Sequence, residues 1–394
     1  MADTLIDTQE VLTVDFENIG ILGRIWRGRI WYGTEWYITV FGGLILVMMI
    51  LMTIFAPAIA PYDPNEFVGA QFTPPGFGEQ TLLARQGQSP VTDAGNLAGQ
   101  VIGVQRNKNG VNLARRLEGV EGMRYQTEDE LLSALEDGDV DLIFVDSKLA
   151  PEIMSKHPGL EIVAEGLGTR FLLGTDNLGR DIVSRLIWGA RTVLGVALAS
   201  ALFSSIIGIA LGLISGFFSG IIDRILSLIM DSLYSFPGLL LAIAMVAMLG
   251  PGLINVAIAV SVIYIPTFFR VVRGQVLSIK QELYIEAAQS LGASSLSLLT
   301  RYIFPNVIPS VVVVFSLNVA DAILTEAGLS FIGLGLPPDI PDWGYDLSKG
   351  QSYLVAGHWW MITFPGIMIT LVAVGFSLLG EGLSELLNPR LVKN

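Results

Sequence analysis

The chain has 394 residues, of which 52% are apolar and 15% are charged, and its mean hydropathy is +0.60. This composition is typical of an integral membrane protein and is too hydrophobic for an ordinary soluble protein. A net charge of −13 argues against nucleic-acid binding, and a sequence without cysteine excludes disulfides and thiolate metal sites.

Two further functions are excluded by the residues themselves. His157 and His358 lie far apart in the sequence, which argues against a histidine-based metal centre. No glycine-rich loop of the P-loop type occurs, so any ATP hydrolysis that powers the protein belongs to another subunit. We therefore expect neither a catalytic residue nor a bound cofactor or metal in this chain.

Residues 1–35 form a predicted cytoplasmic tail. Three arginines lie between residues 24 and 29, and positive charge before a first span places the amino terminus inside. Residues 58–60 resemble a signal-peptidase site, yet the apolar run before them is longer than the roughly 7–15 residues of a cleavable signal. The sequence therefore predicts a retained transmembrane helix over 36–60.

The composition changes at residues 66–170, which we predict to form a soluble α/β domain outside the membrane, because they follow the first span. Thr127 is expected to cap a helix, with Glu130 completing a capping box and Gly138 ending the helix. Alternating strand-like and helix-like segments predict a small, mostly parallel sheet with helices on its faces. The expected strands are 101–104, 140–145 and 160–164, and the expected helices are 111–117, 127–135 and 149–155.

Residues 171–394 contain five further apolar stretches. The expected spans are 191–216, 229–250, 252–270, 305–329 and 359–379. Several glycines in the second span let membrane helices pack closely, namely Gly195, Gly208, Gly212 and Gly216. Six spans in total place both termini and the long loop between residues 270 and 301 in the cytoplasm.

Two pairs of opposite charge precede the second span. Asp176 and Arg180, and likewise Asp181 and Arg185, have the i,i+4 spacing that on an exposed helix contributes about 0.2–0.5 kcal/mol for each pair. We predict a salt-bridged helix at the membrane surface that leads into the span.

The long cytoplasmic loop contains a predicted short helix from Tyr284 to Gly292. Ala287 and Ala288 are small enough to allow close approach of another protein, Glu286 supplies one fixed charge, and Gly292 can turn the chain. Such a helix fits a groove on a partner. It also fits an amphipathic helix that contacts only lipid headgroups.

Several motifs stand in a consistent order along the chain. They lie at residues 60–64, 173–181, 235–237, 284–292, 301–306, 326–335 and 388–390. Together they resemble the C-type permease subunit of dipeptide, oligopeptide and nickel ATP-binding-cassette importers, over about 36–66 and 171–394. Tyr302 and Phe304 stand where the family usually has His and Leu, and Asn388 stands where it usually has Asp.

The resemblance implies a polytopic α-helical membrane protein with six transmembrane helices and the type I importer fold. It implies a heterodimer with a second homologous permease subunit, one or two cytoplasmic ATPases that bind ATP and Mg, and an extracytoplasmic solute-binding protein. Residues 280–296 would be the coupling helix that the ATPases move. The implied ATPase contacts are Tyr284, Glu286, Ala287, Ala288 and Gly292, and the implied external gate is Asp176, Arg180, Asp181 and Arg185.

The fifth span carries polar residues at membrane depth. Asn318, Asp321 and Thr325 share one helical face, with Glu326 beside them and less deep than Asp321. Carboxylates in a membrane are costly and usually face a bundle interior or a cavity. These four residues are expected either to line the translocation pathway and contact a peptide's amino end, or to bond across helices to the partner subunit.

The inserted domain has a resemblance of its own. Residues 101–105 and 130–141 are similar to one lobe of an amino-acid-type extracytoplasmic solute-binding protein, and Asp146 matches a position that often holds the ligand's amino group. Asn107 and Lys108 replace the usual Gly-Thr that would cradle a carboxylate. Only one lobe is present, so we favour a docking or gating role for 66–170 over ligand capture.

An alternative reading is a membrane receptor with an extracytoplasmic sensing domain. The insert favours it, but the sequence shows no kinase, cyclase or coiled-coil output segment, and the ordered motifs would be unexplained. We therefore predict an importer permease for peptides or a related small solute, in the cell membrane. The identity of the solute does not follow from the sequence.

Overall fold

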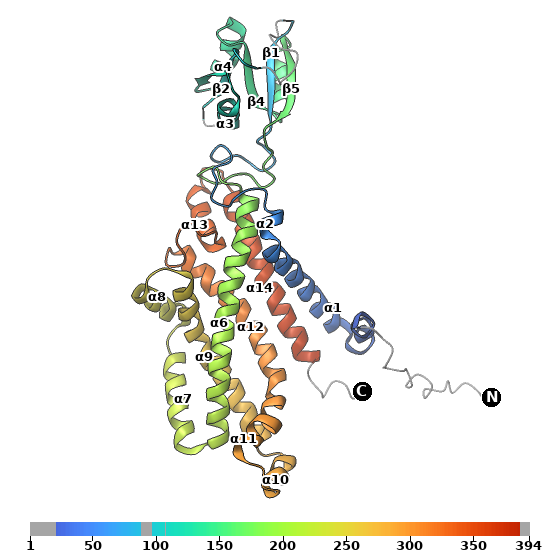
Figure 1. The fold of residues 1–394 in the computed structure, drawn as a ribbon, viewed down its shortest axis with the longest axis vertical. Coiled ribbons are helices and arrows are strands. Elements are labelled where there is room, and N and C mark those ends of the chain that lie inside the picture. Colours follow the sequence, from blue (N-terminus) through green and yellow to red (C-terminus); the bar gives the residue numbers. More distant parts are fainter. Residues whose placement is uncertain (1–20, 88–96, 107, 387–394) are drawn as a thin grey trace, which may run out of the picture.

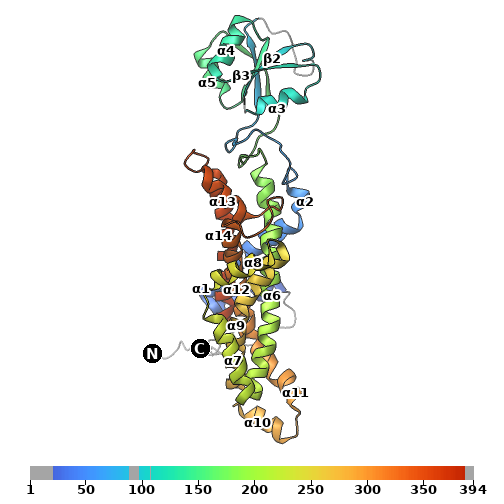
Figure 2. The same cartoon turned by 90° about the vertical axis from the view of Figure 1, so that its left-hand side faces the viewer.

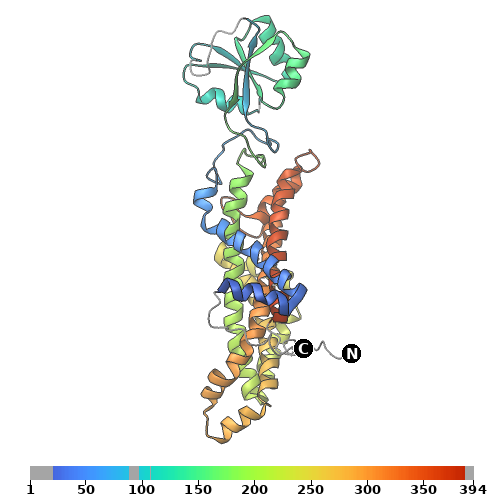
Figure 3. The same ribbon diagram turned by 90° about the vertical axis from the view of Figure 1, so that its right-hand side faces the viewer.

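The computed structural model describes residues 21–87, 97–106 and 108–386, with side chains described from residue 36 to residue 384. Figure 1 shows a bundle of long helices with a small α/β domain at one end and helices α10 and α11 at the other. The same extended shape is seen after quarter turns in Figures 2 and 3. Some predicted features lie outside the described residues, namely the tail before residue 21, Asn107 and the motif at 388–390. The side chains of the arginines at 24–29 are also outside the described part.

Five described helices are long and apolar enough to cross a membrane. Each predicted span lies within or close to one of them, except the third, because runs of about 20 apolar residues have few alternatives to a membrane helix. The helix of the first span starts at Ile21, inside the predicted tail, and that of the second starts at Ile182. The five are α1 (Ile21–Ile54), α6 (Ile182–Phe218), α9 (Leu253–Ile279), α12 (Phe304–Phe331) and α14 (Trp360–Leu386).

The third predicted span, 229–250, is wrong as a single helix. Helices α7 (Gly220–Tyr234) and α8 (Gly238–Leu249) meet at an angle of 88°. Pro237 precedes α8, and because proline disfavours helical backbone in the residue before it, the helix stops and restarts there. The pair has the composition of one bent crossing, which would give six spans in total.

Close packing of α6 against α9 depends on glycine. A Cβ atom on Gly208 would lie 2.5 Å from Cβ of Phe268, and one on Gly216 would lie 2.7 Å from Cβ of Val276. Gly212 lies between them on the same face and is equally crowded. The predicted role of these glycines is confirmed, whereas a Cβ on Gly195 would meet nothing within 4 Å.

The inserted domain is a five-stranded sheet in the order β3-β2-β4-β1-β5. The sheet is mixed, so the expectation of a mostly parallel one is wrong: β2 pairs in parallel with β3 and β4, while β1 pairs antiparallel with β4 and β5. The strands are β1 (Gln80–Arg85), β2 (Val101–Gln105), β3 (Glu121–Tyr125), β4 (Leu142–Asp146) and β5 (Leu160–Leu167). The helices are α3 (Asn109–Arg116), α4 (Glu128–Asp137) and α5 (Ala150–Lys156).

The predicted elements of the insert are confirmed, and two strands were missed. Thr127 and Glu130 form the expected capping box, and Gly138 ends α4 in the left-handed conformation. Strand β3 was not predicted because it is an exposed edge strand without an alternating apolar pattern. Strand β1 was not predicted because its sequence mixes polar and apolar residues. Apolar clusters lie on both faces of the sheet, so the insert has a hydrophobic core of its own, separate from that of the helical bundle.

Candidate functional site

The predicted coupling loop lies at the end of the molecule farthest from the insert (Figures 1 and 2). It contains α10 (Leu283–Ser290), α11 (Ser295–Ser297) and a π-helical turn (Leu298–Ile303) that runs into α12. Ile285 and Ala288 are buried against the ends of α9 and α12. Ala288 therefore faces its own chain, and of the two alanines only Ala287 is turned outward.

The outer face of the coupling loop is apolar. Leu283 is 80% exposed, Leu291 89% and Leu296 71%, although each is a large hydrophobic side chain. Glu286 lies among them, and within the described residues its carboxylate forms no ion pair. Exposed apolar patches rimmed by polar groups mark interaction sites, so this face has the character of a partner surface.

One glycine and two hydrogen bonds fix the shape of the loop. Gly292 has φ of +85°, in the left-handed region, and a Cβ there would meet nothing within 4 Å. Glycine is therefore required by the backbone conformation and not by crowding. At the start of the loop, Lys280 Nζ donates to the Phe217 carbonyl oxygen at 2.7 Å, and Tyr284 Oη accepts from Asn306 Nδ2 at 3.4 Å.

The candidate pathway residues of α12 do not form one cluster. Asn318 is buried and its Nδ2 donates to the Val314 carbonyl oxygen at 2.8 Å. Thr325 Oγ1 and Tyr264 Oη, on α9, are hydrogen-bonded at 2.9 Å. Asp321 lies on the exposed side of the helix. Of the four residues, only Asp321 is exposed on the surface of this chain.

Glu326 has a different environment. It is completely buried, and Ser330 Oγ lies 3.0 Å from its Oε1 and also contacts the Asp342 carboxylate. Asp342 caps α13 (Trp343–Tyr353) by accepting from Gly344 N at 2.8 Å, and burial raises the pKa of this carboxyl. In this structure Glu326 is therefore buried where α12 meets the start of α13.

The charged motif before the second span is a buried loop and not an exposed helix. Asp176 Oδ2 and Arg180 Nε are 2.6 Å apart, as the spacing predicts, but both side chains are buried. The predicted pair between Asp181 and Arg185 is wrong. Asp181 caps α6, accepting from Ser184 N at 2.8 Å, because an aspartate at this position satisfies free helix N–H groups.

Arg185 instead joins three segments at the end of the bundle nearest the insert. Its Nη2 lies 2.6 Å from Asp346 Oδ1, on α13, and its Nη1 donates to the Pro64 carbonyl oxygen at 3.2 Å. Asp346 was not predicted as the partner. The available signal is a carboxylate three residues after Trp343, in the polar segment between the last two predicted spans.

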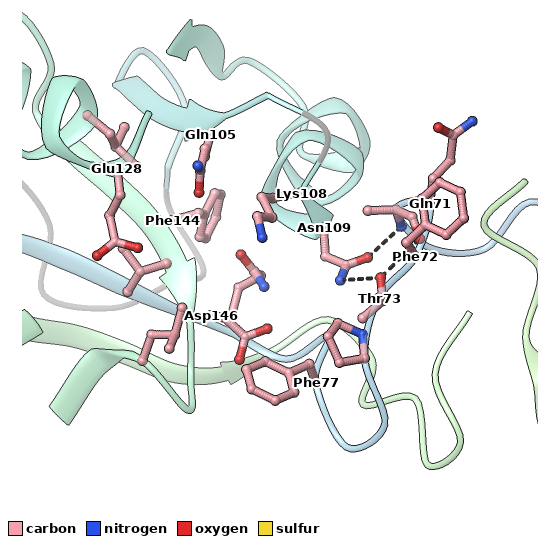
Figure 4. A pocket seen from close by; sticks show the side chains of 16 residues that line it. Gln71, Phe72, Thr73, Phe77, Gln105, Lys108, Asn109, Glu128, Phe144 and Asp146 are labelled. Carbon is pink, nitrogen blue, oxygen red and sulfur yellow. Dashed lines mark hydrogen bonds between the residues drawn. The ribbon is translucent and has the colours of Figure 1, made fainter. Parts of the chain in front are cut away.

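The edge of the insert where Asp146 lies is covered by residues 60–79, the segment between α2 (Ala56–Ile59) and β1, which we call the linker (Figure 4). Asp146 Oδ2 accepts from Gly78 N at 3.1 Å. Asn109, at the start of α3, accepts from Ala70 N at 2.6 Å and donates to Thr73 Oγ1 at 3.1 Å. A cavity of about 120 Å³ remains beneath the linker. The groups that could hold an amino acid are thus bonded to the chain itself.

The same linker contacts the loops of the helical part at the end nearest the insert. Val68 N and Gly69 N both donate to the Gly179 carbonyl oxygen at 3.0 Å. The ring of Phe72 stacks on His358, with centroids 4.2 Å apart and planes inclined by 14°. One segment therefore contacts both the insert and the charged motif around Asp176.

Comparison with known proteins identifies the family. Residues 208–393 match the inner membrane component of binding-protein-dependent transport systems, and residues 38–75 match the N-terminal transmembrane domain of oligopeptide transport permease C. The glutathione transport system permease protein GsiD of Pectobacterium atrosepticum is 45% identical over 228 residues, which cover 58% of this chain and 75% of that protein. The chain belongs to this permease family.

The chain is also similar to a second curated relative and to two kinds of solved structure. GsiD of Shigella flexneri is 42% identical over 244 residues, covering 62% of this chain and 80% of that protein. Among solved structures, the MetNI methionine transporter aligns with 18% identity and a TM-score of 0.44, covering 52% of this chain and 96% of that one. The arginine-binding protein of T. maritima aligns with 21% identity and a TM-score of 0.23, covering 25% and 43%.

The permease is thus a C-type subunit of an ATP-driven importer and a multi-pass inner membrane protein. The strands of its α/β insert, from Gln80 to Leu167, lie between the two family matches. The linker, by contrast, begins inside the first match. The insert is therefore an addition to the part of the chain that matches the family.

Proposed function

We propose that this permease imports peptide-like solutes in an assembly with a second homologous permease subunit, one or two cytoplasmic ATPases and an extracytoplasmic solute-binding protein. ATP and Mg would be bound by the ATPases, and this chain would be non-catalytic. The two GsiD relatives, named for glutathione transport, support a peptide-like solute. The alternative of a sensing receptor has no observation in its favour beyond the presence of the insert.

The exposed face of the coupling loop is the observation that carries the proposal. Ile285 and Ala288 anchor α10 to the ends of α9 and α12, while Glu286, Ala287 and Leu291 point away from the chain. A protein bound to that face would push or pull on two membrane helices at once. This is the connection that converts movement of the ATPases into reorientation of the spans.

We further propose that both termini and the coupling loop are cytoplasmic and that the insert is extracytoplasmic. The coupling loop and the insert lie at opposite ends of the long axis, which supports this orientation (Figure 1). The insert would act at the outer mouth, where a solute is delivered. Its linker contacts the outer loops around Gly179 and His358, which supports a docking or gating role.

The test is ATP hydrolysis by the reconstituted complex with its binding protein. Changing Glu286→Lys together with Gly292→Pro should leave the permease inserted but abolish solute-stimulated hydrolysis, because charge and turn are both lost. Asp339→Lys, an equal charge reversal on an exposed residue of the outer loop, is the matched control and should leave stimulation intact. Normal stimulation in the double variant would refute the coupling role.

A further inference from the structure

A second hollow lies beside the linker, at the sheet face covered by α3. It has a volume of about 290 Å³ and is lined by three arginines, Arg106, Arg115 and Arg124, together with Asn112 and the backbone segment 69–71. No aspartate or glutamate is among its lining residues. Lys108 borders both hollows, and Figure 4 shows its amino group directed toward the first.

Strand register places the arginines together. Val104 on β2 is paired with Arg124 on β3, so both side chains project from the same face of the sheet. Val104 belongs to the apolar cluster that includes Ala114 of α3, which identifies this as the α3 face. Arg106 follows Val104 by two positions and lines the same hollow, opposite Arg115 on α3.

The three arginine side chains are exposed, so their charges lie at the surface of the hollow and not in the core of the insert. In the described part of the chain, none of the three arginines forms an ion pair, although the whole chain carries a net charge of −13. Arg115 is favoured by its place in the last turn of α3, but Arg106 and Arg124 have no such reason. The first turn of α3 contains no acidic residue, and its N-cap, Lys108, makes no capping bond. A cation at an exposed helix N-terminus is unfavourable by about 0.3–1 kcal/mol, and a bound anion would offset this.

We propose that this hollow binds the carboxylate of a small peptide-like solute. Its volume is close to the lower end of the roughly 300–1,000 Å³ of small-molecule sites, and planar guanidinium groups match a carboxylate in geometry and charge. α3 and the linker lie at the end of the insert nearest the membrane helices, on the way to the outer mouth (Figures 1 and 2). The choice of a peptide carboxylate rests on the proposed import function.

The cavity in Figure 4 is a different site. Asp146 and Glu128 line it, and the linker covers it through Asn109 and Gly78. An anion would be repelled by those two carboxylates. The basic hollow has neither carboxylate among its lining residues.

The experiment is calorimetric titration of the purified full chain in detergent, without ATPases. The probe is acetyl-Ala-Glu, which has two carboxylates and no amine, and the comparison is the same peptide with both carboxylates amidated. Arg106→Gln and Arg124→Gln should each weaken binding of the acid about fivefold to tenfold, because each removes a charge-assisted hydrogen bond. Arg116→Gln is the matched control, since Arg116 follows Arg115 on α3 but does not line the hollow.

Binding of the acid alone, weakened by rising salt and lost in the triple glutamine variant, would support the site. Equal binding of the amidated peptide, no binding of the acid, or equal loss with Arg116→Gln would overturn it. Tighter binding of inorganic phosphate would overturn the carboxylate assignment, and binding only to vesicles of anionic lipid would identify a headgroup site instead. Because no ATPase is present, failure here with normal coupling in the assembled complex would leave the proposed function intact.

Discussion

At the scale of single residues, the outer end of the permease depends on Arg185. Its side chain is 2% exposed and that of Asp346 is 13% exposed, so the pair is largely removed from water. A buried ion pair adds little net stability when intact, yet loss of one partner leaves an uncompensated charge. The guanidinium also satisfies the Pro64 carbonyl oxygen, so it connects the start of the linker, α6 and α13.

Arg185→Met should therefore lower the stability of the permease by about 3–5 kcal/mol, because Asp346 would remain buried without a counter-ion. Adding Asp346→Leu should recover part of the loss, since no buried charge would then be unpaired. The measurement is the thermal unfolding midpoint in detergent. Arg270→Met is the control, because the ion pair of Arg270 with Asp231 is exposed and should contribute about 0–1 kcal/mol. Equal shifts for Arg185→Met and Arg270→Met would contradict this account.

Asp321 is the pathway candidate that the structure leaves accessible. Asp321→Asn should reduce transport while basal ATP hydrolysis and assembly with the partner permease continue, because the change removes a charge and keeps the shape. Leu324→Ala, a nearby change on the exposed side of α12, is the control and should transport normally. Transport and co-purification of the partner should both be measured. Failure to assemble would favour a bond between the subunits over a role in the pathway.

At the scale of elements, the long apolar runs were sufficient to predict the membrane helices. They were not sufficient to predict where those helices begin and end. The start of α6 contains Arg185 and Asp181 precedes it, so composition alone marked the stretch as a surface segment. The right angle between α7 and α8 depends on a single Pro237 whose effect could equally have been a slight kink. The inward face of α10 was not predicted, because Ala287 and Ala288 are chemically identical and tertiary packing alone distinguishes them.

Helix packing between α6 and α9 gives a sharp test. Gly208→Leu should prevent close contact and strongly lower the yield and unfolding midpoint, because even a Cβ would lie 2.5 Å from Phe268. Gly195→Leu is the matched control on the same helix, where a Cβ meets nothing within 4 Å. Similar damage from both changes would show that glycine matters here for some reason other than contact with α9.

The stack of Phe72 on His358 should make the outer linker sensitive to pH. Burial lowers the pKa of His358, so the folded protein favours the neutral ring. The stabilisation is complete above the unfolded pKa of about 6.5 and is lost as pH falls from there through the lower folded value. The fall in unfolding midpoint between pH 7.5 and pH 5.5 should be smaller in His358→Phe, which keeps a ring but cannot titrate. An unchanged pH dependence in that variant would assign the effect to other groups.

At the scale of the whole molecule, the sequence supports an orientation that single cysteines can test, since the natural chain has none. Glu165→Cys in the insert and Val355→Cys in the outer loop should react with an impermeant maleimide in intact cells. Leu291 in the coupling loop is 89% exposed, and Leu291→Cys should react only after the membrane is permeabilised. Labelling of Leu291→Cys in intact cells would reverse the proposed topology.

The insert and its linker should have separable roles. Phe171 N donates to the Phe77 carbonyl oxygen at 2.9 Å, so residues 79–168 can be removed and the ends joined by a short Gly/Ser bridge. Segment 68–77 then stays in the chain but loses the hydrogen bonds that Ala70 and Thr73 make with Asn109. This deletion should preserve insertion, basal ATP hydrolysis and the linker's contacts with the outer loops. It should weaken delivery from the binding protein, measured as transport into reconstituted vesicles.

A longer deletion, of residues 68–168, should have a further effect, because it also removes the donors to Gly179 and the ring stacked on His358. If the linker holds the outer loops in place, this variant should lower the unfolding midpoint and raise basal ATP hydrolysis, whereas the shorter deletion should do neither. Unchanged transport after the shorter deletion would refute docking by the insert. Identical behaviour of the two deletions in every assay would show that the linker contributes nothing of its own to the outer gate.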